Sequence, residues 1–261
     1  MQAVTWSELQ DQALAAAPAL EVYNTLRARD FSIISEVKRS SPSKGFLADI
    51  AQPEVLAAAY QAGGAQMISV LTEKRRFGGS LADLDAVRAE VTIPVLRKDF
   101  MVDAYQVLEA RAHGADVILL IVAALTDGQM SEMYAQAHEL GMSVLVEVHD
   151  DRELERAIDL DAELIGVNAR NLKTLDVDLA TCVNLIPKIP TDCIAVAESG
   201  ISSLQDIALL ANASADVALI GEALVTGGAP TETVREWTLE GAKVRTTAHD
   251  RTPVGHHKDG V

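Results

Sequence analysis

The sequence predicts an α/β protein of the (β/α)8 class, a TIM barrel, with an extra helical segment at its N-terminus. Eight short apolar runs rich in Val, Ile and Leu recur every 21 to 34 residues, and stretches with helical periodicity separate them. The runs are apolar on both faces, as expected for parallel strands that are buried on both sides. The chain also lacks the G-x-G-x-x-G loop that is typical of open dinucleotide-binding sheets. Eight consecutive strand–helix units therefore favour a closed barrel over an open sheet.

The predicted strands and helices alternate from residue 32 to residue 239. Local signals mark several helix ends: Pro53 suits a first turn, Ser80 suits an N-cap, and Gly114 and Gly141 suit C-terminal stops. The strands begin near Ser32, Gln66, Pro94, Asp116, Met142, Glu163, Asp192 and Asp216. Helices are predicted at residues 53–61, 80–90, 103–113, 126–140, 150–160, 178–186, 202–211 and 230–239.

The two ends of the chain depart from this alternation. Residues 7–29 are predicted to form the extra helical segment, which we expect to cover one end of the barrel. Residues 246–261 are polar and rich in His, Pro and Gly, which predicts a disordered tail. No linker-like stretch interrupts the repeating units, so residues 1–245 are predicted to form one domain.

Composition argues against several classes of protein. The 22 basic and 38 acidic residues give a net charge of −16, which repels nucleic acid but still allows an anionic small molecule to bind in a local cationic pocket. The longest apolar stretch, residues 117–125, is far shorter than the ~20 residues of a membrane span. Residues 1–26 contain no Lys or Arg, unlike an export signal.

Cys182 and Cys193 are interpreted as reduced thiols of a cytoplasmic protein. No spacing of His, Cys or carboxylates indicates a metal site, and no feature points to a particular protein partner.

Polar residues replace the apolar pattern at the ends of five predicted strands. The active site of a (β/α)8 barrel lies at the carboxyl ends of its strands, so these residues are the candidates for chemistry. A single charged residue at a strand end is usually a solvated rim residue. Two Lys and three Glu that converge on one opening instead favour an acid–base cluster in a partly dry cleft. The residues are Glu36, Lys38, Lys98, Glu147, Asn168 and Glu198, with Arg170 just beyond.

The loops after the last two predicted strands indicate a phosphate site. Ser199-Gly200 and Gly221-Glu222 follow these strands, and glycine lets an anion approach bare backbone N–H groups. The alternative is that each glycine only eases a tight turn.

Three more residues fall in loops at the same end of the predicted barrel. Phe77 lies beside two glycines, as in a mobile loop with an apolar tip. Phe100 belongs either to the same pocket or to the ordinary core. His149, which follows the fifth predicted strand, is interpreted as a rim or helix-entry residue.

Six strings of residues at these strand ends carry a close resemblance to one enzyme family. They are SEVKRSSPSKG at residues 35–45, FGGS at 77–80, LRKDF at 96–100, VEV at 146–148, GVNARNL at 166–172 and AESGI at 197–201. The first string is highly specific, whereas phosphate loops are shared by many barrels. Residues 31–239 thus resemble indole-3-glycerol phosphate synthase of tryptophan biosynthesis.

The resemblance implies a carboxy-lyase without a metal or an organic cofactor. Its substrate would be 1-(2-carboxyphenylamino)-1-deoxyribulose 5-phosphate, a small phosphorylated aromatic molecule that undergoes ring closure and loses CO₂ and water. Lys98 matches the general acid at the substrate ketone, and Lys38 matches the residue that holds the carboxylate or acts in dehydration. Glu147 matches the group that takes or gives a proton in dehydration, while Glu36 and Asn168 match orienting residues.

Other positions match the substrate-binding residues of the family. Arg170 and Glu198 match groups that orient the substrate. The positions that match phosphate-binding residues are Ser41, Ser199, Gly200, Gly221 and Glu222. The positions that match the apolar pocket for the anthranilate ring are Phe77, Phe100 and Leu119. Some family members carry Ser in place of Glu222, so we expect the Glu222 side chain to point away and only its N–H to help.

The implied chemistry fits these residues, but two alternatives stay open. Condensation at a ketone needs an acid, which a Lys with a lowered pKa can supply, and the aromatic ring needs apolar walls. One alternative is another phosphosugar barrel enzyme, such as phosphoribosylanthranilate isomerase, whose catalytic Cys neither Cys182 nor Cys193 matches. The other is a non-catalytic barrel that binds a phosphorylated ligand, which the presence of Lys98 and Glu147 disfavours.

Overall fold

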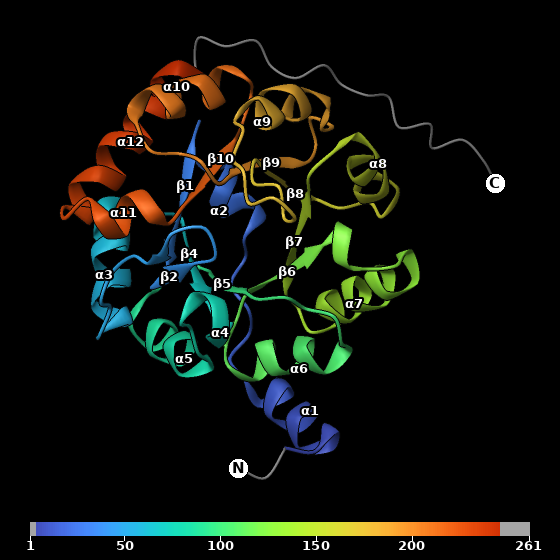
Figure 1. Cartoon of the computed structure of the whole chain (residues 1–261). Helices are drawn as coiled ribbons and strands as arrows, with labels where there is room; N and C mark the ends of the chain where they lie inside the picture. The colour runs from blue at the N-terminus through green and yellow to red at the C-terminus, as the bar shows by residue number, and fades with distance from the viewer. Residues whose placement is uncertain (1–3, 246–261) are drawn as a thin grey trace.

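Eight parallel strands close into a barrel in the computed structural model, which describes residues 4–245 (Figure 1). Around the barrel the order is β1-β10-β9-β8-β7-β6-β5-β4, so strands adjacent in sequence pair and the last closes on the first. The predicted fold class is confirmed, and the predicted tail at 246–261 lies outside the described residues. The barrel strands are β1 (Ser32–Val37), β4 (Met67–Leu71), β5 (Val95–Lys98), β6 (Val117–Ile121), β7 (Ser143–Val148), β8 (Leu164–Asn168), β9 (Ile194–Glu198) and β10 (Val217–Ile220).

Helices connect the strands and form an outer ring (Figure 1). As expected from the sequence, Pro53 lies in the first turn of its helix, and the Ser80 side chain accepts a hydrogen bond from the Asp83 N–H. None of the helices within residues 4–245 has the length and apolar character of a membrane span. The ring consists of α3 (Pro53–Gly63), α5 (Leu81–Glu90), α6 (Ala104–Ala112), α7 (Asp127–Glu139), α8 (Asp151–Asp159), α9 (Ala180–Leu185), α10 (Leu204–Asn212) and α12 (Pro230–Arg245).

Short elements that the sequence analysis did not predict lie in the loops. An antiparallel hairpin of β2 (Ser40–Ser41) and β3 (Gly45–Phe46) follows β1. Helices α4 (Lys74–Phe77) and α11 (Glu222–Thr226) follow β4 and β10. Each is too short to show a hydrophobic period in the sequence.

The N-terminal segment forms two helices, whereas the sequence predicted one helical segment over 7–29. Helix α1 (Trp6–Ala15) ends because Ala16 is extended, with ψ of 147°, two residues before Pro18. Helix α1 packs on α6 (Figure 1), and a short α2 (Tyr23–Arg27) follows. Val22 and Leu26 are buried in the barrel interior, so the segment closes the end opposite the carboxyl ends of the strands.

The barrel interior is apolar except at the carboxyl ends of the strands. Inward residues such as Ile34 are fully buried and pack against one another. The strand register places charged side chains above this layer, with Glu147 beside Ile121 and Glu198 beside Asn168. The charged groups therefore lie above a layer of buried apolar side chains that includes Ile34, Leu96 and Leu145, called the apolar floor below.

Candidate active site

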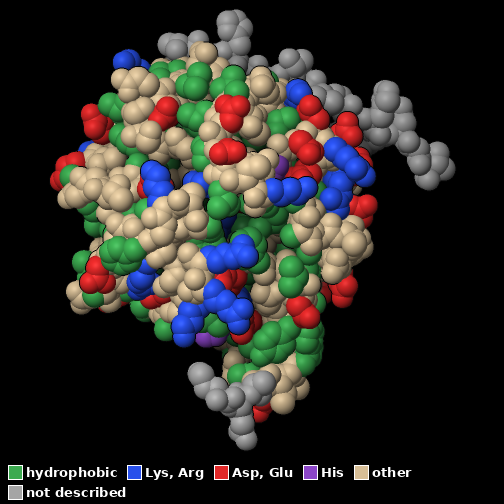
Figure 2. All heavy atoms as spheres, viewed as in Figure 1, with side chains coloured by type: hydrophobic (Ala, Val, Ile, Leu, Met, Phe, Trp, Pro, Cys, Tyr) green, Lys and Arg blue, Asp and Glu red, His purple; other side chains and the backbone are tan. Residues whose placement is uncertain are grey.

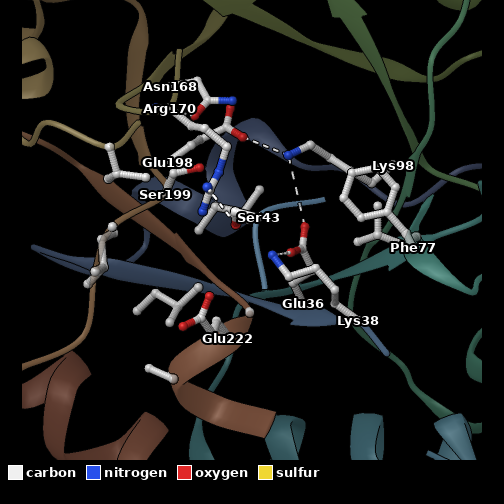
Figure 3. A pocket seen from close by; sticks show the side chains of 18 of the residues that line it. Glu36, Lys38, Ser43, Phe77, Lys98, Asn168, Arg170, Glu198, Ser199 and Glu222 are labelled. Carbon is white, nitrogen blue, oxygen red and sulfur yellow. Dashed lines mark hydrogen bonds and ion pairs between the residues drawn. The ribbon is translucent and has the colours of Figure 1, made fainter. Parts of the chain in front are cut away.

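A cavity of about 930 Å³ opens at the carboxyl ends of the barrel strands (Figure 3). Its size suits a small organic ligand. The structure brings fourteen of the fifteen predicted site residues to its wall, and Ser41 is the exception. The fourteen are Glu36, Lys38, Phe77, Lys98, Phe100, Leu119, Glu147, Asn168, Arg170, Glu198, Ser199, Gly200, Gly221 and Glu222.

Lys98, at the end of β5, is the centre of a charged cluster (Figure 3). Its Nζ lies 2.8 Å from Glu198 Oε2, 3.7 Å from Glu147 Oε2 and 3.9 Å from Glu36 Oε2. The Lys98 side chain is 13% exposed, and none of the three Glu side chains exceeds 4%. Carboxylates this deeply buried need a cation nearby, and Lys98 provides one.

The pKa of Lys98 is raised, which corrects the expectation of a lowered value. Burial alone lowers the pKa of an amine, but the attraction of Glu198, Glu147 and Glu36 together outweighs burial. Lys98 therefore stays protonated in the resting site. A bound molecule that separates the ammonium from these carboxylates would make Lys98 a stronger acid.

Glu36 links Lys98 to the second lysine of the cavity. Its Oε1 lies 2.8 Å from Lys38 Nζ, and the Ser69 hydroxyl donates to Oε2 over 3.4 Å. Burial raises the pKa of Glu36, but Lys38 and Lys98 outweigh burial and leave the pKa lowered. Both lysines thus contact one carboxylate within one cavity.

Glu147 and Glu198 have pKa values shifted in opposite directions. Burial raises the pKa of both, but the close contact with His149 and the charge of Lys98 lower the pKa of Glu147 to about 2. For Glu198, burial exceeds the attraction of Lys98, and repulsion by Glu147 adds to it, so the pKa rises to about 7. Two carboxyl groups with separated pKa values are a common arrangement for acid–base chemistry.

Two glycines make room for carboxylates on adjacent strands: Gly166 of β8 for Glu198 of β9, and Gly221, directly after β10, for Glu36 of β1. A Cβ added at Gly166 would lie 2.1 Å from Glu198 Oε1, and one at Gly221 would lie 2.5 Å from Glu36 Oε1. Neither distance is sterically possible without movement of the carboxylate. A side chain at position 221 would therefore displace the Glu36 carboxylate, and it would also hinder an anion that approaches the backbone there.

One wall of the cavity is apolar and aromatic. The Phe77 and Phe100 ring centroids lie 6.2 Å apart with an interplanar angle of 42°. Leu119 lines the same region from β6, and Leu71 and Ile121, which the sequence analysis missed, add to it. Their inward position on alternating strand residues was the signal that could have identified them.

The opposite wall offers backbone and cationic groups to an anion. Ser199 and Gly200 line the cavity with φ values of +67° and +76°, and backbone turns can direct N–H groups toward an anion. Arg170 Nη1 lies 2.9 Å from Ser43 Oγ, which ties the loop after β1 to the loop after β8 (Figure 3).

Two expectations for the phosphate positions do not match the structure. Ser41 is buried in the hairpin, where its Oγ accepts a hydrogen bond from the Lys44 N–H over 3.2 Å. Ser43 and Lys44 line the cavity in its place. Glu222 does not point away from the cavity but lines it and forms an ion pair with Lys44.

Positive charge gathers at the centre of the face shown in Figure 2, while Asp and Glu lie mostly toward its rim. Lys38, Lys44, Lys98 and Arg170 line the cavity. Seven acidic residues line the same cavity, so the wall as a whole is not cationic. An anionic ligand would therefore depend on contacts with these individual cations and with backbone N–H groups.

Metal ligation and thiol chemistry find no support in the described part of the chain. Residues 4–245 contain no group of three or more His, Cys, Asp or Glu placed to hold a metal ion. Cys182 lies in α9 and Cys193 directly before β9, and both are buried outside the cavity wall. Neither thiol sits at the carboxyl end of a strand, as phosphoribosylanthranilate isomerase chemistry would require.

Comparison with known proteins adds independent information. A model of the indole-3-glycerol phosphate synthase family matches residues 1–237. The chain is similar to indole-3-glycerol phosphate synthase 1 of Streptomyces coelicolor, with 55% identity over 238 residues that cover 91% of this chain and 88% of that protein. It is also similar to indole-3-glycerol phosphate synthase of Rhodococcus opacus, with 56% identity that covers 88% of this chain and 86% of that protein.

Solved structures of other enzymes share only the fold. A thiamine phosphate pyrophosphorylase from Pyrococcus furiosus superimposes with a TM-score of 0.62 and 15% identity, covering 86% of this chain and 99% of that one. A 3-hexulose-6-phosphate synthase from Salmonella typhimurium gives 0.65 and 15%, covering 84% of this chain and 100% of that one. The relatives and the family match instead extend through the sequence of the site, and the chain belongs to the indole-3-glycerol phosphate synthase family.

Proposed function

We propose that the cavity converts 1-(2-carboxyphenylamino)-1-deoxyribulose 5-phosphate into indole-3-glycerol phosphate, with release of CO₂ and water. Membership of the family makes the chain a carboxy-lyase of tryptophan biosynthesis. The observation that carries the residue roles is the placement of Lys98 Nζ within 3.9 Å of three carboxylates, in a cavity with an aromatic wall. In this proposal residues 1–245 act as one domain, in the cytoplasm and without a cofactor.

The two walls of the cavity suit the two ends of this substrate. The aromatic ring packs between Phe77, Phe100 and Leu119, and the phosphate binds to backbone N–H groups at Ser199 and Gly200. Apolar walls favour an aryl ring and backbone N–H groups favour an anion, so the substrate lies across the barrel axis. This pose brings the substrate ketone toward Lys98 and its carboxylate toward Lys38.

Each chemical step then has a group in reach. Lys98 donates a proton to the ketone oxygen while the aryl carbon attacks the carbonyl carbon. Lys38 neutralises the carboxylate until it departs as CO₂. After CO₂ has left, Lys38 donates the proton with which the hydroxyl departs as water, and the ionised Glu147 takes the ring proton that leaves as the indole forms.

The role of Lys98 is tested by two substitutions. Lys98→Ala should lower kcat by about 10²- to 10⁴-fold, as is typical when a general acid is removed. Lys98→Arg retains a cation among the three carboxylates, so it should fold normally and yet stay slow, because guanidinium is a poor acid. Indole fluorescence during turnover measures both. Near-normal turnover of either variant would mean that another group protonates the ketone.

A further inference from the structure

His149 and Lys98 contact different carboxylate oxygens of Glu147. One carboxylate oxygen of Glu147, Oε2, is 3.7 Å from Lys98 Nζ, and the other, Oε1, is 3.4 Å from His149 Nε2. This contact is an ion pair without hydrogen-bond geometry, and the buried Nε2 has no hydrogen-bond partner within residues 4–245. Contacts of this length in a resting site often shorten when substrate binds. Glu147 is thus held between two basic groups.

A second carboxylate holds the His149 ring from the other side. Glu153, in the first turn of α8, places its Oε2 2.9 Å from His149 Nδ1 and 2.8 Å from the His149 backbone N. The side chains of His149 and Glu153 are only 14% and 18% exposed, so solvent screens these contacts weakly. One ring nitrogen faces each carboxylate, so an imidazolium can donate to both at once.

We propose that His149 is a positioning residue for Glu147: an imidazolium held by Glu153, it orients Glu147 Oε1 and keeps this carboxylate ionised for proton transfer. The inference rests on the proposed role of Glu147 as a proton acceptor. His149 directly precedes Asp150, the N-cap of α8, so it is a helix-entry residue as expected, and the inference adds this role.

The charges around the pair favour this assignment. Glu147 faces Lys98 from β5, Glu198 from β9 and the Asn168 amide from β8, whereas His149 faces Glu147 and Glu153. Burial lowers the pKa of His149, but the two carboxylates outweigh burial and raise it to about 10. His149 is therefore a cation throughout the neutral range, and its removal raises the pKa of Glu147.

The test uses two variants and a matched control in the full-length protein. His149→Gln removes the cation, and Glu153→Gln removes the charge that holds it. Glu155→Gln makes the same change at an exposed position of α8 and should leave activity unaltered. The readouts are kcat and KM from pH 5.5 to 8.5, together with a ¹⁵N NMR titration of the histidine ring, which needs no substrate.

We expect KM to change little, and kcat relative to the unaltered enzyme to fall by about threefold or more as the pH decreases from 8.5 to 5.5. In the unaltered enzyme both nitrogens of His149 should stay protonated at pH 8, and Glu153→Gln should lower the pH at which the ring titrates. A loss of kcat that is equal at all pH values, or a neutral ring at pH 8, would overturn the inference. If the unaltered enzyme fails to turn over the substrate while the ring titrates as expected, the proposed function is what fails.

Discussion

Lys98 and its three carboxylates form a cluster in which no member has its ordinary pKa. A raised pKa for Lys98, lowered values for Glu36 and Glu147, and a value of about 7 for Glu198 follow from mutual distances below 4 Å in a buried site. Lys38 also contacts Glu36 and His149 also contacts Glu147, whereas Glu198 shares Lys98 with the other two carboxylates. Burial therefore exceeds the attraction of Lys98 at Glu198, repulsion by Glu147 adds to it, and Glu198 accepts a proton most readily. The protonation state of Glu198 therefore changes near neutral pH.

Glu198→Gln should change how stability depends on pH. The folded-state pKa of Glu198 is raised from its ordinary value of 4.5 to about 7, so the folded protein binds more protons than the unfolded chain between these values. The stability that Glu198 contributes is complete below pH 4.5 and is lost as the pH rises through 7. A glutamine has no such dependence, so the variant should gain stability relative to the unaltered protein between pH 5 and pH 8. Urea unfolding at pH 5 and pH 8 measures the free energy of unfolding of both proteins. The same difference in this free energy at both pH values would contradict the prediction.

The pairing of strands β8 and β9 positions Glu198 in the charged cluster. Asn168 and Glu198 are register partners, and Gly166, one inward position earlier on β8, leaves the space that the Glu198 carboxylate occupies. The same relation joins Gly221 of the loop after β10 to Glu36 of β1. A substitution of Gly221 would therefore disturb Glu36 and lower kcat, in addition to raising KM through the phosphate site.

Gly166→Ala tests this relation between strands. The added Cβ would lie 2.1 Å from Glu198 Oε1 and 3.1 Å from Leu145 Cδ1, so the carboxylate must leave its present position beside Lys98. A displacement of about 1 Å in a catalytic site can lower kcat by about a hundredfold, and we expect a loss of that order. Gly128→Ala in α7 is the control, because an added Cβ there meets nothing within 4 Å. Steady-state kcat of the two variants tests this expectation. Equal kcat values would show that the Glu198 carboxylate accommodates the added methyl group without loss of function.

In the whole molecule, the catalytic cavity and the N-terminal segment lie at opposite ends of the barrel. Residues 16–30 cross beneath the strands, with Val22 and Leu26 buried in the interior and the Leu20 N–H donating to Asp116 Oδ1 over 2.7 Å. The apolar floor lies between this segment and the charged cluster. Stability and catalysis are therefore expected to respond to different substitutions.

Leu26→Ala should destabilise the protein without slowing the chemistry. Leu26 is 1% exposed, and truncation of a buried leucine costs about 2–5 kcal/mol. Leu14→Ala, on the same N-terminal segment but 69% exposed, should have little effect. Urea unfolding measures the stability, and kcat at 25 °C should remain close to that of the unaltered enzyme. A large loss of kcat in folded Leu26→Ala protein would mean that the two ends of the barrel are coupled.

The sequence was sufficient to predict the barrel and fourteen residues of the cavity wall. The barrel follows from the alternation of eight apolar runs with helical stretches, and a period of two identifies the inward residues at strand ends such as Glu36 and Lys98. The aromatic and phosphate positions depended on the loops and on the family resemblance. The break in the N-terminal segment at Ala16 was missed because its helical composition outweighed the signal of Pro18. The raised pKa of Lys98 could not be inferred, because it depends on distances between residues of four different strands. The position of Ser41 outside the cavity wall could not be inferred for a related reason: an unpredicted hairpin reverses the chain at that point.

Gly166 and Glu198 occupy adjoining space, so neither position is free to evolve alone. In a lineage that acquired alanine at 166, the longer acid at 198 would have to shorten to aspartate or relocate, and the reverse order of events would be tolerated more readily. Gly221 and Glu36 impose the same historical constraint across the seam where the barrel closes. Among descendants of a common ancestor, these two pairs should therefore change together or not at all.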